Sequence, residues 1–282
     1  MAGNFNEPAY TCNPTWLSGD HMRRLKLAAV LLLFAACRPS VASRLSDGRW
    51  VDLTYPFDST TIYWPTAQPF RLTVVSAQRT PGGYYYAANN FTAAEHGGTH
   101  LDAPVHFAEG KHTTDQIPVS QLMGPAVVID VTHQADSSAD YRVRPADITA
   151  WESAHGAIPR GAIVLIRTGW GSRWPDRARV LGTTKTGAAA IPELHFPGLD
   201  LDAARELARR KVNAVGIDTP SIDYGQSSIY GVHRRLFAVN IPAFENVANI
   251  EQLPATGAYV IALPFKIKGG SGGPLRIVAL LP

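Results

Sequence analysis

The stretch from residue 95 to 107, which reads EHGGTHLDAPVHF, constrains this chain more than any other part of it. Paired glycines at Gly97 and Gly98 destabilise a helix, so the stretch is predicted to be a tight turn followed by a short extended segment. Alternate side chains share a face in an extended segment, so His100 and Asp102 should point the same way, and the turn lets His96 fold back toward them. Two imidazoles and a carboxylate that converge in this way suit zinc or manganese.

A single histidine is usually a packed or hydrogen-bonded side chain, and this simpler interpretation stands beside the metal site. Three histidines and an aspartate around a glycine turn are hard to explain as core filling. Pro104 should end the extended segment and bring His106 to the rim of the site. We assign His106 as the catalytic proton shuttle between the attacking water and the leaving nitrogen, with a fourth metal ligand as the alternative.

This stretch resembles the HxGTHxDxPxH signature of the cyclase family, which contains bacterial kynurenine formamidases and isatin hydrolases. Residues 51–54 resemble the opening strand of that family, and Phe244-Glu245-Asn246 resembles its closing glutamate segment. The resemblance covers about residues 50–282. It implies one mixed α/β, β-rich domain of the cyclase type, swivelling β/β/α-like, over residues 43–282.

The resemblance also implies a second half of the site. In the kynurenine formamidase branch, a late histidine and glutamate at the separation of His233 and Glu245 complete a site for two metals. By that resemblance His96, His100 and Asp102 hold the first ion, Asp102 bridges, and His233 and Glu245 hold the second. Without the family, a histidine flanked by arginines is as readily a solvated side chain.

The number of ions and the identity of the metal stay open at this stage. Isatin hydrolases resemble this chain and use a glutamine among the ligands of a single ion. Gln226 does not align securely with that glutamine, so we expect it to be a turn residue that hydrogen-bonds the backbone. The expected cofactor is therefore one or two ions of zinc or manganese per chain.

The ligand set predicts hydrolysis, because a catalytic metal lowers the pKa of a bound water. By resemblance, the expected enzyme is a metal-dependent amidohydrolase that cleaves an aryl amide, like kynurenine formamidase acting on N-formylkynurenine in tryptophan catabolism. The alternatives are ring opening of a cyclic amide such as isatin, or a non-catalytic exported metal-binding protein. Trp64 is expected to contact the substrate. Like Phe70 and the tyrosines at 84–86, it either lines an aryl pocket beside the metal or is an ordinary sheet aromatic, which is the more common case.

Residues 1–42 are predicted to be an N-terminal extension and a targeting segment. Residues 22–26 are basic, and the apolar run at 27–36 is too short to span a bilayer. The run ends in a lipobox-like sequence that would place a lipid anchor on Cys37, whereas residues 40–42 would suit an ordinary signal peptidase. We therefore expect export to the periplasm or the membrane surface, with a short buried helix in a cytoplasmic protein as the alternative. Cys12 and Cys37 are the only cysteines, so the body offers no thiolate ligand.

Composition and periodicity predict a folded body. Hydrophobic residues make up 45% of the chain and charged residues 17%, which permits a sizeable core, and no basic stripe suggests nucleic-acid binding. By resemblance the protein is expected to be a homo-oligomer, a dimer or a tetramer. The glycine-rich run at 269–273 is predicted to be a flexible hairpin loop. The expected strands are 50–54, 70–76, 125–131, 162–167, 212–217, 258–263 and 275–281, and the expected helices are 145–155, 199–211 and 230–239.

Overall fold

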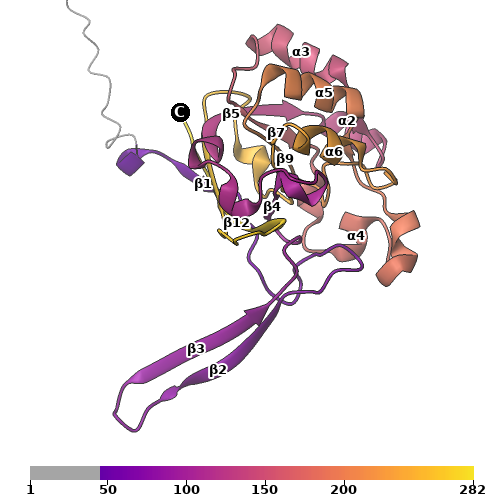
Figure 1. Ribbon diagram of the computed structural model, residues 1–282. Coiled ribbons are helices and arrows are strands. Elements are labelled where there is room, and N and C mark those ends of the chain that lie inside the picture. Colours follow the sequence, from indigo (N-terminus) through magenta and orange to yellow (C-terminus); the bar gives the residue numbers. More distant parts are fainter. Residues whose placement is uncertain (1–44) are drawn as a thin grey trace, which may run out of the picture.

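Seven strands of the computed structural model, which describes residues 45–282, form a closed β-barrel (Figure 1). Strand β4 pairs on one side with β10 and on the other with β12, and this second pairing closes the barrel. Strand β1 (Trp50–Asp52) lies outside the ring, antiparallel to β12. Around the barrel the order is β12 (Gly272–Leu280), β11 (Tyr259–Pro264), β5 (Met123–Asp130), β7 (Ile163–Arg167), β9 (Ala214–Ile217), β10 (Ala243–Glu245) and β4 (His100–Asp102).

The parallel strands β5, β7 and β9 separate two layers of core. Side chains such as Val128 and Leu165 fill the barrel, whereas Val127 and Val164 point the other way, toward helices. Burial on both faces explains why these strands read as continuous apolar runs. Three helices, which Figure 1 shows on one side of the barrel, form the outer layer: α3 (Pro145–His155), α5 (Leu201–Arg210) and α6 (Gly231–Phe237). The predicted mixed, β-rich α/β domain is confirmed.

Short elements connect the two layers. The parallel pair β6 (Arg142–Val143) and β8 (Gly198–Leu199) lies outside the barrel. Helix α2 (Thr132–Ser137) follows β5, and α4 (Arg177–Leu181) follows a 3₁₀ turn after β7. Among residues 45–282, no helix is both long enough and apolar enough to cross a membrane.

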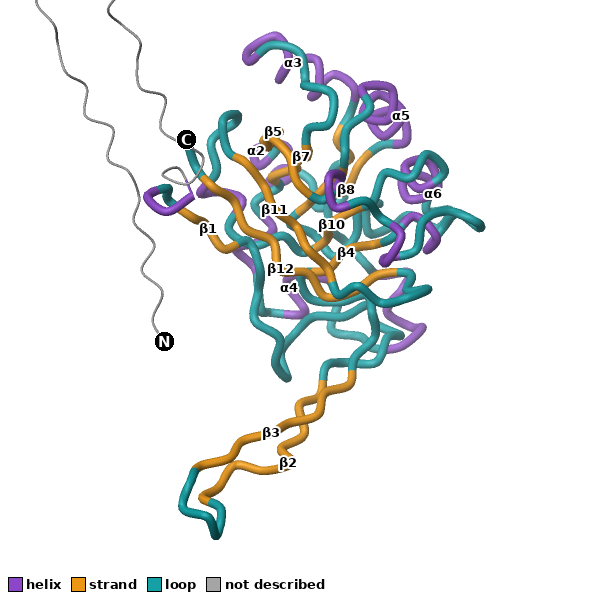
Figure 2. The backbone as a smooth tube through the Cα atoms, turned by 60° about the vertical axis from the view of Figure 1, so that its left-hand side comes forward, coloured by secondary structure: helices purple, strands orange, loops and turns teal. Residues whose placement is uncertain are grey.

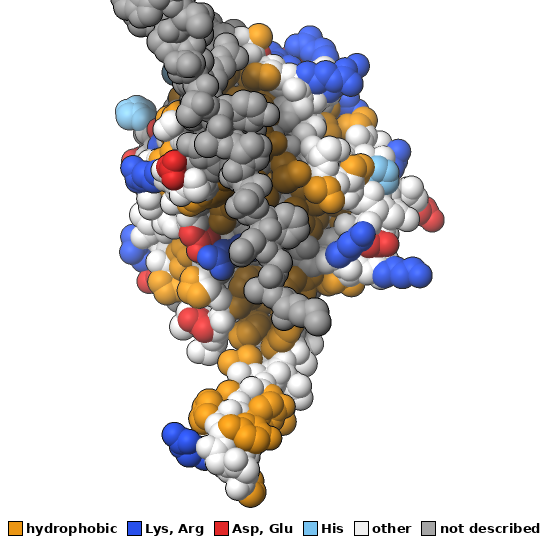
Figure 3. All heavy atoms as spheres, turned by 90° about the vertical axis from the view of Figure 1, so that its left-hand side faces the viewer, with side chains coloured by type: hydrophobic (Ala, Val, Ile, Leu, Met, Phe, Trp, Pro, Cys, Tyr) orange, Lys and Arg blue, Asp and Glu red, His pale blue; other side chains and the backbone are white. Residues whose placement is uncertain are grey.

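A β-hairpin projects from the barrel as a long arm (Figure 2). It consists of β2 (Arg71–Arg79) and β3 (Tyr85–Thr92), which pair with each other and form a separate sheet. Figure 3 shows hydrophobic side chains gathered along this arm. The tyrosines at 84–86 therefore lie on an exposed arm and do not line a pocket. The exposed large side chains of the arm are Leu72, Val74, Val75, Tyr84, Tyr85, Tyr86 and Phe91.

The glycine-rich run at 269–273 lies in the hairpin connection from β11 to β12, as predicted, and backbone hydrogen bonds attach it to neighbouring segments. The backbone N–H of Ala103 donates to the carbonyl of Ser271 over 2.8 Å, and that of Thr114 donates to Gly270 over 2.9 Å. Gly272 already belongs to β12, opposite Asp102. These bonds hold the loop against the strand that carries the predicted ligands.

The predicted targeting segment, residues 1–42, and the proposed lipid-anchor residue Cys37 lie outside the described residues.

Candidate metal centre and active site

Strand β4 presents His100 and Asp102 on one face, as the alternation of an extended segment predicts. Leu101, between them, points into the barrel core and is fully buried. Glu245 on β10 is the register partner of His100, so the pairing of the two strands places the carboxylate beside the imidazole. All three polar side chains are buried, with Asp102 only 1% exposed.

The glycine turn returns His96 to this face. Gly98 has φ +57°, a conformation that favours glycine, and the backbone at Gly97 is covered by the ring of Tyr63. The turn places Nδ1 of His96 2.6 Å from Oδ1 of Asp102. The predicted cluster of His96, His100 and Asp102 therefore forms in the structure.

Helix α6 supplies His233 from the other side. Its Nε2 atom lies 3.1 Å from Oδ2 of Asp102 and 3.1 Å from Oε1 of Glu245. The side chain of His233 is buried, so the alternative of a solvated histidine between arginines is wrong. The structure thus brings together all five predicted ligands, three imidazoles and two carboxylates.

Hydrogen bonds fix the rings of two of these histidines. Nδ1 of His100 lies 3.0 Å from the Gly98 carbonyl, and Nδ1 of His233 lies 2.6 Å from Oδ2 of Asp223. These oxygens can only accept, so in each ring Nδ1 carries the hydrogen and Nε2 keeps a lone pair for the neutral imidazole. Asp223 therefore fixes the ring of His233, in the arrangement by which a carboxylate can orient a histidine ligand.

The buried Nε2 atom of His100 tests whether a cation suits this centre. It lies 3.1 Å from Oδ1 of Asp102 and 3.4 Å from Oε2 of Glu245, yet it makes no hydrogen bond. An unpaired polar atom that faces two carboxylates is costly inside a protein. A divalent cation among these atoms would satisfy all of them, so the residues fit a zinc or manganese ion.

Electrostatic coupling is strong throughout this cluster. Burial alone would raise the pKa of Asp102, but the charge of His96 and the bonds from the other imidazoles hold it well below its usual range. Burial opposes the charged form of His100, yet the adjacent Asp102 raises the pKa of His100 to about 9. Burial and the nearby charge of Asp102 raise the pKa of Glu245. The cluster therefore attracts positive charge, whether protons or a cation.

His106 lies beside the cluster in a 3₁₀ turn (Pro104–His106) that follows β4. Its ring stacks on His96 with centroids 3.8 Å apart. Burial lowers the pKa of His106 to about 4, so its imidazole is neutral at neutral pH and can accept a proton. Ring nitrogens of His96 and His106 and an oxygen of Asp102 lie within 4.8 Å of one another, so the geometry also accommodates the alternative of a fourth ligand.

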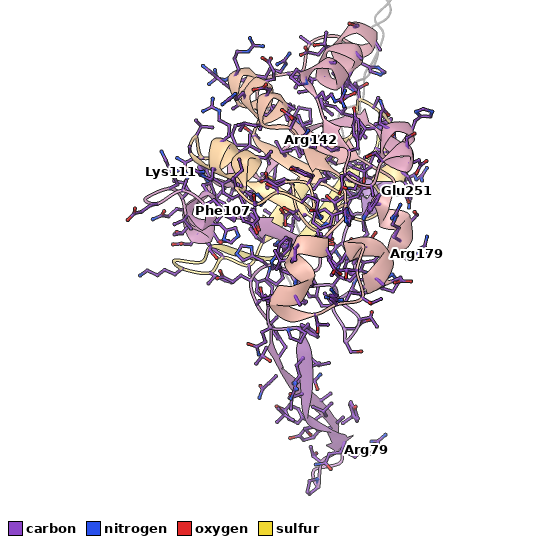
Figure 4. The ribbon with its side chains drawn as sticks, turned by 90° about the vertical axis from the view of Figure 1, so that its right-hand side faces the viewer. Arg79, Phe107, Lys111, Arg142, Arg179 and Glu251 are labelled. Carbon is purple, nitrogen blue, oxygen red and sulfur yellow. The ribbon has the colours of Figure 1, made fainter. Side chains whose placement is uncertain are left out.

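A cavity of about 270 Å³ opens onto the cluster. Its other walls are mostly apolar and aromatic, which suits an aryl group beside the polar centre. Trp64, the predicted substrate contact, lines this cavity and meets Phe196 edge to face. Figure 4 places Phe107, another lining residue, in the body of the molecule, far from Arg79 on the hairpin arm.

Gln226 does not reach the cluster. Its amide donates to the carbonyl of Leu194 over 2.6 Å, which confirms the prediction of a turn residue bonded to the backbone. Sequence reasoning missed two other polar side chains that support the site. Asn246 donates to the Gly98 carbonyl over 2.9 Å, and Ser271 lies 2.9 Å from Nε2 of His96. The glycine run around Ser271 was the available signal, but its partner lies 175 positions earlier.

Comparisons with known proteins show which sequences this chain resembles. The family model described as "Putative cyclase" matches residues 51–224. An isatin hydrolase from Roseibium aggregatum is 36% identical over 208 residues, which cover 71% of this chain and 77% of that protein. A kynurenine formamidase from Salinibacter ruber is 29% identical over 232 residues, which cover 81% of this chain and 95% of that protein.

Solved structures show the same fold. Isatin hydrolase A from Ralstonia solanacearum superposes with a TM-score of 0.78 at 33% identity, covering 88% of this chain and 99% of that one. A predicted metal-dependent hydrolase from Bacillus stearothermophilus superposes with a TM-score of 0.59 at 26% identity, covering 82% and 97%.

Proposed function

The chain belongs to the cyclase family of hydrolases, and from this membership we propose that it hydrolyses the C–N bond of an aryl amide with the help of a divalent cation. The convergence of His96, His100 and His233 on the two buried carboxylates carries the proposal. The adjoining cavity gives an aromatic substrate an apolar wall next to that centre. Because its relatives are hydrolases, a non-catalytic metal-binding protein is not favoured.

We assign the cation to His96, His100, Asp102, His233 and Glu245. A divalent cation in such a site makes water more acidic and polarises a carbonyl group. His106, held neutral by burial, takes a proton from the attacking water and delivers it to the nitrogen as the C–N bond breaks. Trp64 lies on the cavity wall, where it can hold an aromatic ring by stacking or edge contact.

A cyclic aryl amide such as isatin is the favoured substrate class. The chain is 36% identical to an isatin hydrolase over most of its length and 29% identical to a kynurenine formamidase. N-formylkynurenine is the second candidate, because the late pair His233 and Glu245 is present and points at the cluster, as the formamidase resemblance implied. The proposal includes one or two ions per chain, of zinc or manganese.

Metal analysis together with two assays tests the proposal. Purified protein should contain about one or two zinc or manganese ions per chain. It should open isatin or release formate from N-formylkynurenine, and a chelator should abolish the activity until metal is restored. Turnover of neither substrate by metal-loaded protein would contradict both assignments. A protein that binds no zinc or manganese would contradict the metal centre itself.

We also propose that the protein is exported and that it forms a homo-oligomer, and other parts of the chain support these two proposals. The basic and apolar run at 22–36 supports export, with Cys37 as the lipid-anchor residue. The hairpin arm supports a homo-oligomer, because an isolated two-stranded hairpin is marginally stable and this one exposes large apolar side chains.

A further inference from the structure

Glu95 and Ser271 form a hydrogen-bonded pair directly behind His96. Oε2 of Glu95 accepts the backbone N–H of Ser271 over 3.0 Å and the hydroxyl of Ser271 over 2.5 Å. Oγ of the same serine lies 2.9 Å from Nε2 of His96. The other ring nitrogen of His96 faces Asp102. The four side chains therefore form one continuous line from Glu95 to the centre of the site.

The chemistry of these groups fixes the direction of every hydrogen bond in the line. A carboxylate only accepts, so the single hydroxyl hydrogen of Ser271 is committed to Glu95. Oγ can then only accept from His96, which places the hydrogen on Nε2. In the neutral imidazole Nδ1 is left with a lone pair, 2.6 Å from Oδ1 of Asp102.

We propose that Glu95 and Ser271 are positioning residues that select this tautomer, so that His96 binds the cation through Nδ1 while His100 and His233 bind through Nε2. The inference rests on the proposed metal centre and deepens it. In His100 and His233 the hydrogen is held on Nδ1 by Gly98 and Asp223. Each of the three imidazoles thus directs its free lone pair toward Asp102, which no arrangement with the opposite tautomer of His96 would achieve.

The glycines on either side of Ser271 fit this role. A Cβ atom on Gly272 would lie 2.6 Å from Cε1 of His96, and one on Gly270 would lie 2.9 Å from Oε1 of Glu95. Both distances are below normal contact, so only glycine lets the serine reach between the two side chains. The glycine-rich run therefore serves the approach of Ser271 to His96.

The test uses the full chain loaded with zinc, and nitrogen-15 NMR of its histidines. The wild-type spectrum should show His96 protonated at Nε2 and bound to zinc through Nδ1. Ser271→Ala removes the acceptor for Nε2 of His96, and Glu95→Ala removes the carboxylate that holds the hydroxyl hydrogen, so that Oγ of Ser271 can donate to Nε2 instead of accepting from it. Each should raise the dissociation constant for zinc about 10- to 100-fold, and Ser271→Thr, which keeps the hydroxyl, should restore binding.

Asp115→Asn is the matched control. Oδ1 of Asp115 accepts from the backbone of Gly269 over 2.9 Å and so holds the same loop without touching His96. Its zinc affinity should equal that of the wild type. If Asp115→Asn and Ser271→Ala lost zinc affinity equally, or if His96 bound zinc through Nε2, the inference would be overturned while the metal centre would stand. A wild-type protein that binds no zinc would overturn the metal centre and the inference with it.

Discussion

Asp102 contacts all three histidines of the cluster. Its two oxygens lie 2.6 Å from His96, 3.1 Å from His100 and 3.1 Å from His233. This carboxylate is buried at the centre of the site, where the charges around it are screened little by water. The residue-scale predictions therefore concern the groups that surround it.

His106→Ala should keep its metal and lose activity. We expect metal content to stay at the wild-type level and kcat to fall at least about 10²-fold, as when a general acid–base group is removed. Elemental analysis and steady-state turnover measure the two effects. His133→Ala, which alters a histidine outside the cavity, is the control. Loss of metal from His106→Ala would make His106 a ligand, and full activity would remove it from the mechanism.

Asp223→Asn should weaken metal binding without touching a ligand. The carboxylate accepts from Nδ1 of His233 over 2.6 Å and from the backbone N–H of the same residue over 3.1 Å. An amide has no negative charge to hold the hydrogen on Nδ1, and in either orientation its NH2 group would face a backbone N–H that the carboxylate now accepts, so the ring of His233 would be held less well. Calorimetric titration should show affinity about 10- to 100-fold lower. Unchanged affinity in a variant with wild-type circular dichroism would contradict this orienting role.

The sequence allowed the clustering of these side chains to be predicted where the spacing is short or the family supplies the pattern. His100 and Asp102 follow from alternation along a strand, and His233 and Glu245 follow from the family resemblance. Ser271 and Glu95 could not be found in this way, because their contact joins positions 176 apart through a pairing of β4 with β12. The direction of a hydrogen bond also depends on three-dimensional contacts.

At the scale of elements, long apolar runs were predicted well, and so were the short strands β1 and β4, whereas the short strand β10 was not. Strands β5, β7 and β9 and helices α3 and α5 lie within a few residues of their predicted bounds. Strand β10 has three residues, too few for any periodicity to appear. Its place in the sheet is set by its neighbours β9 and β4, so only the structure reveals it.

An ion pair joins helix α3 to helix α5 and should make part of the stability depend on pH. Arg210 contacts Glu152 through two bonds, of 2.8 Å and 2.6 Å, and lowers the pKa of Glu152 to about 2. A carboxylate with a lowered pKa stabilises the fold above its unfolded pKa of about 4.3 and loses that contribution as pH falls toward about 2. The two side chains are partly exposed to water, which limits how much the ion pair contributes to the stability of the fold.

Glu152→Gln should therefore lower the free energy of unfolding by about 1 kcal/mol at pH 7, and the difference from wild type should shrink as pH falls below about 4. Urea denaturation at a series of pH values measures this difference. Glu109→Gln, at an exposed position, is the control and should change little at any pH. A deficit for Glu152→Gln that stayed constant down to pH 3 would show that the charge of Glu152 is not its source.

At the scale of the whole molecule, the hairpin arm is the feature that the barrel alone does not explain. Val74 is 62% exposed and Val75 is 61% exposed, in a two-stranded sheet that no further strand joins among residues 45–282. An arm of this kind is stabilised when a second copy of the chain covers it. No residue of its two strands lines the cavity of the same chain.

Val74→Asp combined with Val75→Asp should shift the protein to a smaller species. Burying two added carboxylates in an interface is costly, whereas on a free arm they cost little. Light scattering after size-exclusion chromatography measures the mass. Val119→Asp, which changes a valine that is 60% exposed outside the arm, is the control and should keep the wild-type mass. An unchanged mass in the double variant would remove the arm from any interface.

The pairing of β4 with β12, which closes the barrel, also determines at what stage of synthesis the site can form. Strand β12 is the last of the barrel strands to be synthesised, yet β4 needs it as a neighbour and His96 needs Ser271 just ahead of it. While the nascent chain is still on the ribosome and lacks these residues, β4 has one open edge and His96 has no partner for Nε2. The cluster is therefore completed only after β12 has been synthesised, and a polypeptide cut short before β12 would lack the neighbour of β4 and the partner of His96 even if its helices had already formed.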